Sequence, residues 1–369
     1  MSTVKPKPSG TLPSPSLEDY APPASVREAF PLQIQVQYVA TSDVKSFLKA
    51  SRAHPLALIC FDRNAPPPGK ESYPVVQLNL PQVERSPVAE VWMSVAPVTS
   101  SKIEGVSFAM NEQILFGFLE IDEPQKSSLE TLAFGAYGRL LALTRTLGYP
   151  YLLRVWNYFP DINARSAGLT RYQQFCVGRH EAFAEGQPDF RKILPAGSAV
   201  GTRSGPLQIY FLACTKPGTH IENPRQVNAY DYPTIYGPRS PSFARATLSQ
   251  SECGDHLFIA GTASIVGHTS QHIGEPEKQT LETLHNLQAL VDHAKQLQTA
   301  GDGLGDRRSL FKAYIRRPED LSTVSTILKQ HLPTQAQVLC LQGAICRSEL
   351  LLEIEGILTA GSEGGRESL

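Results

Sequence analysis

A pattern of strands and helices that occurs twice constrains the fold of this chain more than any other feature of its sequence. The first copy runs strand, strand, helix, strand, helix, strand over 105–110, 113–121, 127–147, 151–158, 169–184 and 207–213. The same order returns about 150 residues later over 243–249, 256–263, 277–297, 308–316, 318–332 and 337–343, followed by a strand at 349–356. We expect the last two strands to pair as a hairpin. The repeat indicates a duplicated unit rather than two unrelated domains.

The predicted fold class is α+β, with two similar units in tandem, each a mixed sheet with helices packed on one face. We expect an N-terminal domain over 31–205 and a C-terminal catalytic domain over 206–360. Residues 1–30 are rich in proline and serine, which predicts a disordered tail, and 361–369 are expected to form a flexible tail. A binding site is expected where the two units meet.

Charge and hydropathy exclude several classes of partner. The 34 basic and 35 acidic residues nearly cancel, so nucleic acid is not an expected partner. No apolar run reaches the roughly 18 residues that a membrane span needs, and the polar start of the chain lacks the apolar core of a signal peptide. We therefore expect a cytoplasmic protein without a membrane partner.

The sequence carries no recognisable metal or cofactor motif. The six cysteines form no C-x-x-C pair, and His268 and His272, although four residues apart, lie in a segment whose Gly, Ser and Thr favour a loop. Neither G-x-G-x-x-G nor G-x-x-x-x-G-K-[ST] occurs. We expect no metal and no cofactor, so any chemistry uses side chains alone.

The last strand sets carboxylates among apolar residues. With period two, Leu350, Leu352 and Ile354 share one face, and the opposite face carries Glu349, Leu351, Glu353 and Glu355. One interpretation is a solvated acidic face, because glutamate is seldom buried without a partner. The other is that one of these carboxylates is an acid catalyst.

The segment 223–245 has the composition of an ordered binding loop. Prolines at 224, 233, 238 and 241 exclude a helix, yet the segment is rich in tyrosine and arginine. Arg239 and Arg245 are suited to bind carboxylates through their guanidinium groups. The alternative is a surface loop whose arginines pair with local Asp or Glu.

Three further segments give weaker signals. The stretch 154–163 places polar groups at the end of a strand, with Trp156 expected in the core. Gly178-Arg179 has no distinctive context. The small residues 261–264 leave space for a ligand or permit tight backbone packing.

Three motifs, taken together, resemble the chorismatase family. They are Tyr230-Asp231-Tyr232-Pro233 with the run 236–245, the run Gly261-Thr262-Ala263-Ser264-Ile265-Val266-Gly267-His268, and Cys346-Arg347 leading to Leu352-Glu353-Ile354-Glu355-Gly356. The resemblance covers nearly everything after the first tail. It implies a fusion of two units of the RidA/YjgF-like (chorismate mutase-like) fold, which agrees with the repeat, and cofactor-free removal of pyruvate from chorismate.

The resemblance also implies residue roles. Glu353 matches the acid that protonates the enolpyruvyl methylene, and Cys346 matches a position that is cysteine in the aromatising branches and alanine in the hydrolytic one. Gly261 also fits the aromatising type. Arg239, Arg245 and, by position, Arg154 are the candidate partners of the two substrate carboxylates, with Tyr230 and Tyr236 as further binding residues. Since Cys346 and Glu353 are an odd number of residues apart, both reach one pocket only if the chain turns near 344–348.

We therefore expect a chorismate lyase that forms 3-hydroxybenzoate, with 4-hydroxybenzoate as an additional product in one branch of the family. Two alternatives stay open: a hydrolytic chorismatase that forms a dihydroxycyclohexadiene carboxylate, and a non-catalytic small-molecule binder of the RidA type. A monomer is expected, because a duplicated chain can complete its site alone.

Overall fold

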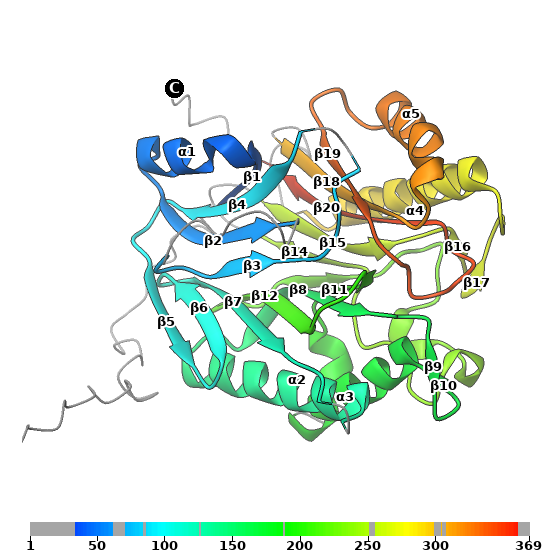
Figure 1. The fold of residues 1–369 in the computed structure, drawn as a ribbon, viewed down its shortest axis with the longest axis horizontal. Coiled ribbons are helices and arrows are strands. Elements are labelled where there is room, and N and C mark those ends of the chain that lie inside the picture. The colour runs from blue at the N-terminus through cyan, green and yellow to red at the C-terminus, as the bar shows by residue number, and fades with distance from the viewer. Residues whose placement is uncertain are drawn as a thin grey trace, which may run out of the picture.

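The computed structural model describes residues 34–61, 71–83, 86–124, 127–186, 189–250, 255–298, 304 and 308–360. The predicted tails at 1–30 and 361–369 lie outside these residues. Three main sheets are seen in the described part of the chain, and helices cover the outer face of two of them (Figure 1). No helix within these ranges is long and apolar enough to cross a membrane.

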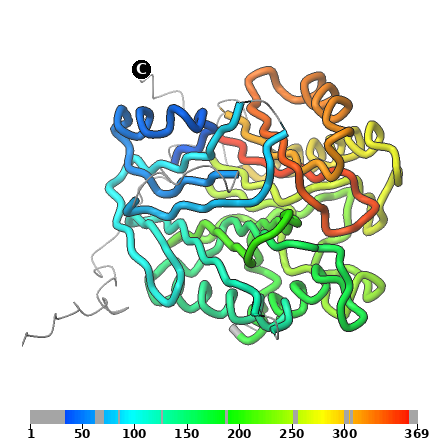
Figure 2. The backbone as a smooth tube through the Cα atoms, viewed as in Figure 1, coloured from blue at the N-terminus to red at the C-terminus, as the bar shows by residue number. Residues whose placement is uncertain are grey.

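The first sheet has four strands in the order β1-β4-β2-β3. Its elements are β1 (Ile34–Ala40), α1 (Val44–Ala50), β2 (His54–Cys60), β3 (Val75–Gln77) and β4 (Val88–Ser94). The sequence analysis did not predict this sheet, because it precedes the first copy of the repeat. Figure 2 shows its strands, in blue and cyan, beside the orange and red strands of the C-terminal half.

The second sheet has six strands in the order β11-β8-β12-β7-β6-β5. Its strands are β5 (Thr99–Ile103), β6 (Val106–Met110), β7 (Ile114–Ile121), β8 (Tyr151–Pro160), β11 (Ala196–Thr202) and β12 (Leu207–Cys214). Its helices are α2 (Leu129–Thr146) and α3 (Arg171–Gly186). The Ser128 hydroxyl accepts a hydrogen bond from the Thr131 backbone N–H and so caps α2.

The third sheet also has six strands, in the order β13-β14-β15-β20-β18-β19. Its strands are β13 (Thr219–Ile221), β14 (Ala246–Ser249), β15 (His256–Thr262), β18 (Arg308–Ile315), β19 (Gln337–Gln342) and β20 (Leu352–Thr359). Its helices are α4 (Pro276–Gln296) and α5 (Leu321–His331). Two short ribbons complete the structure, β9 (Arg165–Ser166) with β10 (Leu169–Thr170) and β16 (Ile265–Val266) with β17 (Thr269–Ser270).

The two six-stranded sheets have the same topology, which confirms the duplicated α+β fold predicted from the sequence. In each, three antiparallel strands are followed by helix, strand, helix and a parallel edge strand. The last strand of each unit then enters the middle of its sheet, β12 between β7 and β8 and β20 between β15 and β18.

This topology corrects two expectations. The predicted hairpin of 337–343 with 349–356 is wrong, since β18 lies between β19 and β20. The predicted boundary at 205 separates β12 from the sheet that it joins, and a division after Cys214 follows the sheets instead. In both cases, the error arose because sequence order does not show where the last strand of each unit inserts.

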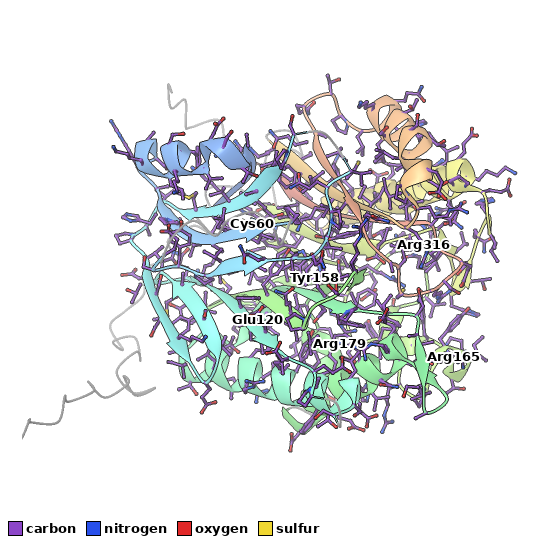
Figure 3. The ribbon with its side chains drawn as sticks, in the orientation of Figure 1. Cys60, Glu120, Tyr158, Arg165, Arg179 and Arg316 are labelled. Atoms are coloured by element: carbon purple, nitrogen blue, oxygen red, sulfur yellow. The ribbon has the colours of Figure 1, made fainter. Side chains whose placement is uncertain are left out.

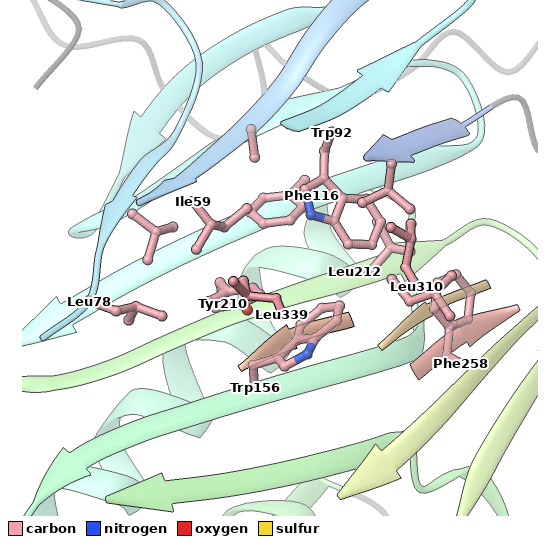
Figure 4. Packing of buried hydrophobic residues seen from close by; sticks show 14 of the residues in the cluster. Ile59, Leu78, Trp92, Phe116, Trp156, Tyr210, Leu212, Phe258, Leu310 and Leu339 are labelled. Carbon is pink, nitrogen blue, oxygen red and sulfur yellow. The ribbon is translucent and has the colours of Figure 1, made fainter. Parts of the chain in front are cut away.

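The largest apolar core lies between all three sheets. Figure 4 shows side chains from each sheet packed together around Trp156 and Tyr210, which stack with ring centroids 4.6 Å apart. Two further cores lie between the second sheet and α2 and α3, and between the third sheet and α4 and α5. The inner faces of the two repeated units are thus both buried, and residues on them sit at the centre of the molecule.

Candidate active site

A cavity of about 400 Å³ opens where the two repeated units meet. At this junction, β11 of the first unit forms single bridges with the second, through Ala196 with Ala244 and Gly201 with Ala344. The cavity walls come from α3, β11, β15, β20, the segment 346–350 and the loop 232–245. The site therefore uses elements of both units, where the sequence analysis expected it.

Glu353 lies on the inner wall of this cavity because of strand alternation. Leu352 and Ile354 of β20 face the helices, so Glu353 and Glu355 face the opposite side of the sheet, toward the first unit. Both carboxylates are buried, at 5% and 3% exposure, which excludes the solvated acidic face. The Glu353 Oε1 atom has no hydrogen-bond partner among the described residues.

Gly261 on β15 makes room for the Glu353 carboxyl group. A Cβ atom at this position would lie 2.5 Å from Glu353 Cδ and closer still to Oε1. Ordinary carbon contacts are about 3.5 to 4.0 Å, so a larger residue would force the carboxyl group to move. The Gly261 backbone N–H also donates a hydrogen bond to Ser198 Oγ across the junction, at 2.9 Å.

The environment of Glu353 favours its protonated form. Burial raises the pKa of Glu353, and the negative charge of Glu355 raises it further, while Arg154 and Arg245 oppose both effects. The resulting pKa is about 8, against an ordinary value of 4.5. At neutral pH the side chain is thus a carboxylic acid with a proton to donate.

Cys346 reaches the same cavity from a turn that precedes β20. Asn163 Nδ2 donates to the backbone carbonyls of Ile345 and Cys346, at 3.0 and 3.1 Å, and Arg316 donates to those of Ile345 and Arg347. The turn that the sequence analysis required near 344–348 is present. Burial and the charge of Glu353 raise the pKa of the Cys346 thiol to about 12, so it is not a thiolate at neutral pH.

The loop 232–245 lines the cavity with aromatic and cationic groups. Arg245 donates to the Tyr232 hydroxyl at 2.8 Å and to the Val227 carbonyl at 3.2 Å, so these contacts are to neutral groups. The Arg347 guanidinium lies over the Tyr236 ring, 3.9 Å from its centroid. Arg239 lies exposed at the cavity wall.

Arg179 on α3 is a binding candidate that the sequence analysis undervalued. It lines the cavity and is only 2% exposed, yet its Nε and Nη2 atoms lack hydrogen-bond partners among the described residues. Figure 3 labels it in the lower half of the molecule, where Arg165 also lies. Buried donors without partners suit an anionic ligand, because an unpaired buried charge is costly. The sequence could not reveal this binding role, because no motif marks Arg179 within its helix and only tertiary packing brings it to the cavity.

Two predicted binding residues do not line the cavity. Arg154 on β8 is 1% exposed, and its guanidinium donates to Ser198 Oγ, Glu355 Oε2 and its neighbour's carbonyl. It therefore supports the cavity from behind rather than contacting a ligand. Tyr230 packs beside His220, outside the cavity wall, with ring centroids 6.1 Å apart.

The charges on the cavity wall suit a ligand with two negative charges. Five arginines line it, Arg165, Arg179, Arg239, Arg245 and Arg347, against two glutamates, Glu349 and Glu353. Because Glu353 is protonated at neutral pH, the wall carries a clear positive excess. The arrangement can therefore hold a dianion beside a carboxylic acid.

Comparison with known proteins identifies the family. A family model described as "Chorismatase FkbO/Hyg5-like, N-terminal" matches residues 90–213. The chain is 36% identical to a 3-hydroxybenzoate synthase of Streptomyces hygroscopicus over 78% of its own length and 86% of that protein. The chain belongs to the chorismatase family. A chorismatase of Streptomyces hygroscopicus is 40% identical over 73% of this chain and 78% of its own length.

A solved chorismatase structure supports the family assignment at the level of the fold. It superposes with a TM-score of 0.77 at 32% identity, covering 88% of this chain and 98% of the solved one. At 88% of the chain, the match is too long to lie within only one of the two repeated units of this chorismatase family member.

Proposed function

We propose that this protein cleaves chorismate to 3-hydroxybenzoate and pyruvate, with Glu353 as the general acid. The observation that carries the proposal is the buried carboxylic acid of Glu353, whose Oε1 has no partner among the described residues, in a cavity lined by arginines. Chorismate carries two carboxylates and an enolpyruvyl ether, so it matches both the positive wall and the need for a proton donor. The names of the two Streptomyces relatives support the same substrate class.

In the proposed reaction, Glu353 protonates the methylene carbon of the enolpyruvyl group. This creates an oxocarbenium-like centre and weakens the ether bond to the ring. The neighbouring ring hydroxyl oxygen then displaces the ether oxygen at its ring carbon, which releases pyruvate and returns the hydroxyl proton to Glu353. The resulting epoxide opens with loss of a ring proton, and its oxygen stays at position 3 of the aromatic product. The two products together contain all the atoms of chorismate, so the aromatising route consumes no water, whereas the hydrolytic route takes up one water molecule.

The two carboxylates of the substrate require cationic partners. Arg179, Arg245 and Arg347 are the proposed partners inside the cavity, with Arg239 at its wall. Arg179 and Arg347 each retain at least one buried nitrogen without a partner among the described residues, so each can donate a hydrogen bond to a substrate oxygen without breaking an existing one.

Cys346 is the proposed selector of the product. Its thiol is protonated at neutral pH, so it acts as a small polar group of the wall rather than as a nucleophile. It occupies the same cavity as Glu353, where its size and polarity decide whether the cleaved ring aromatises or water enters.

Incubation of purified protein with chorismate, followed by chromatography, tests the proposal. We expect 3-hydroxybenzoate and pyruvate in equal amounts, and a Glu353→Gln variant that is inactive although folded. A non-aromatic diol as the only product would support the hydrolytic alternative instead. Wild-type turnover by Glu353→Gln would remove the acid role, and ligand binding without turnover by the wild type would support a RidA-type binder.

We also propose that the protein is cytosolic, and that it is a monomer, because both repeated units of one chain line the cavity. Sedimentation velocity at the assay concentration tests this state, and a larger species that loses activity on dilution would contradict it.

A further inference from the structure

A chain of buried charges lies directly behind the cavity. Lys312 Nζ is 2.9 Å from Glu90 Oε2 and 3.0 Å from Glu355 Oε1, and Arg154 Nη2 is 2.8 Å from Glu355 Oε2. All four side chains are at most 4% exposed. Removing a charge from water costs several kcal/mol of folding free energy, and pairing often does no more than offset that cost. Four buried charges in one place therefore require an explanation.

The four charges come from all three sheets. Glu90 lies on β4 of the first sheet, Arg154 on β8 of the second, and Lys312 and Glu355 on β18 and β20 of the third. Figure 3 labels Tyr158, which follows Arg154 on β8, near the middle of the molecule. The first sheet thus reaches the functional centre through the Glu90 carboxylate, although none of its described residues lines the cavity.

Neutral donors fix the two carboxylates in place. Trp92 Nε1 donates to Glu90 at 2.6 Å, Trp156 Nε1 donates to Glu355 Oε1 at 2.8 Å, and Ser198 Oγ donates to Glu355 Oε2 at 2.6 Å. Burial would raise the pKa of Glu355, but Lys312 and Arg154 hold it below its usual value. Glu355 is therefore ionised at neutral pH, and with Glu90, Lys312 and Arg154 it forms a set of two positive and two negative groups.

Glu355 is also the charged neighbour of the proposed acid. Glu353 and Glu355 are two residues apart on the same face of β20, which places their Cβ atoms about 6.7 Å apart. The groups that face Glu353 from other elements are Arg154 on β8, Arg245 before β14, and the neutral thiol of Cys346. Among these charges only Glu355 is negative, so its charge adds to the effect of burial and opposes ionisation of Glu353.

We propose that Glu90, Lys312, Arg154 and Glu355 form a positioning device that keeps Glu355 ionised, and that this fixed charge keeps the neighbouring Glu353 carboxyl group protonated. Lys312 and Arg154 hold the charge on Glu355, and Glu90 of the first sheet balances the second cation. Without Glu90, the two cations would outweigh Glu355 and favour ionisation of Glu353. The inference rests on the proposed acid role of Glu353.

The test measures kcat/KM for chorismate as a function of pH and compares, between the wild type and the variants, the pH at which it falls on the alkaline side. Glu355→Gln removes the negative charge, and two charges about 7 Å apart inside a protein interact by an amount equal to about one to two pH units. We expect the alkaline fall to move to lower pH by that amount. Glu355→Asp keeps the charge and is expected to restore the wild-type position, which a purely structural role would not predict.

Two further variants guard against misfolding and indirect effects. Glu90 lies farther from Glu353 than Glu355 does. Glu90→Gln is therefore expected to move the alkaline fall of kcat/KM to lower pH by about half a pH unit. Tyr158→Phe removes a buried hydroxyl from the same core without a change of charge, and we expect no shift. Circular dichroism and thermal unfolding establish that each variant is folded.

The outcomes separate this inference from the proposed function. If Glu353→Gln is inactive but folded Glu355→Gln and Glu90→Gln leave the alkaline fall in place, the positioning device is refuted and the acid role stands. If Glu355→Gln does not fold, a Glu90→Gln variant whose alkaline fall stays at the wild-type pH is enough to refute the positioning device. If Glu353→Gln keeps wild-type turnover, the acid role itself has failed.

Discussion

Raising the pH through the pKa of Glu353 is the most direct perturbation of the proposed mechanism. With a pKa of about 8, roughly nine in ten molecules carry the catalytic proton at pH 7, but only about one in ten do at pH 9. A glutamate with its ordinary pKa of 4.5 would be protonated in about 0.3% of molecules at pH 7. The buried environment therefore increases the active fraction about 300-fold at neutral pH.

The expected profile follows from these fractions. We expect kcat/KM for chorismate to be flat between pH 6 and 7 and to fall about tenfold per unit above pH 8. Binding of a dianion adds negative charge beside Glu353, so the fall in kcat is expected at a higher pH than the fall in kcat/KM. Chorismate carboxylates do not titrate in this range and cannot cause the effect.

The assay couples pyruvate release to its reduction, in buffers of constant ionic strength between pH 5 and 10. Chromatography of the aromatic product at each pH guards against an effect on the coupling enzyme, and a thermal unfolding curve at each pH shows that the protein is folded. A rate that falls already between pH 5 and 6, or that stays constant to pH 10, would refute protonated Glu353 as the proton donor.

Three other predictions concern single substitutions. Glu353→Gln is expected to raise the free energy of unfolding by about 3 kcal/mol at pH 7, because the unfolded chain ionises this group above pH 4.5 while the folded protein resists ionisation up to about 8. The wild type thus loses stability as the pH rises from 4.5 to about 8. Urea unfolding of the wild type and Glu353→Gln at pH 5 and pH 8 measures the difference in their free energies of unfolding. An equal difference at the two pH values would contradict the raised pKa of Glu353 as its cause. Arg179→Met is expected to raise KM about 10- to 100-fold with a smaller effect on kcat, and Arg179→Lys to do less; unchanged KM in both variants would exclude a carboxylate contact. Cys346→Ala is expected to shift products from 3-hydroxybenzoate toward the non-aromatic diol, and an unchanged product ratio on chromatography would remove it as the selector.

Much of the fold could be predicted because it depends on local patterns. The repeated order of strands and helices predicted the duplicated α+β fold, and the helix expected over 127–147 agrees closely with α2. The place where β20 enters its sheet could not be predicted, since strand pairing depends on distant segments. The first sheet was missed for a related reason: its strands gain stability from the core that all three sheets share.

The candidate site divides in a similar way. Period two placed Glu353 and Glu355 on one face, and the family resemblance assigned Glu353 its role. The pattern did not reveal that both are buried, or that they differ in protonation. Arg154 was predicted by its position to bind a substrate carboxylate, but its guanidinium pairs with Glu355 in the structure.

The sequence by itself determined which residues share a face, where the chain turns and that the unit is duplicated, because neighbouring residues fix these properties. Only the tertiary structure decided the charge state of the two glutamates. Glu355 meets Lys312 and Arg154 and ionises, whereas Glu353 faces a cavity with an unpartnered oxygen and keeps its proton. Acidity depends on burial and on charges brought from three sheets, and no stretch of sequence contains them all.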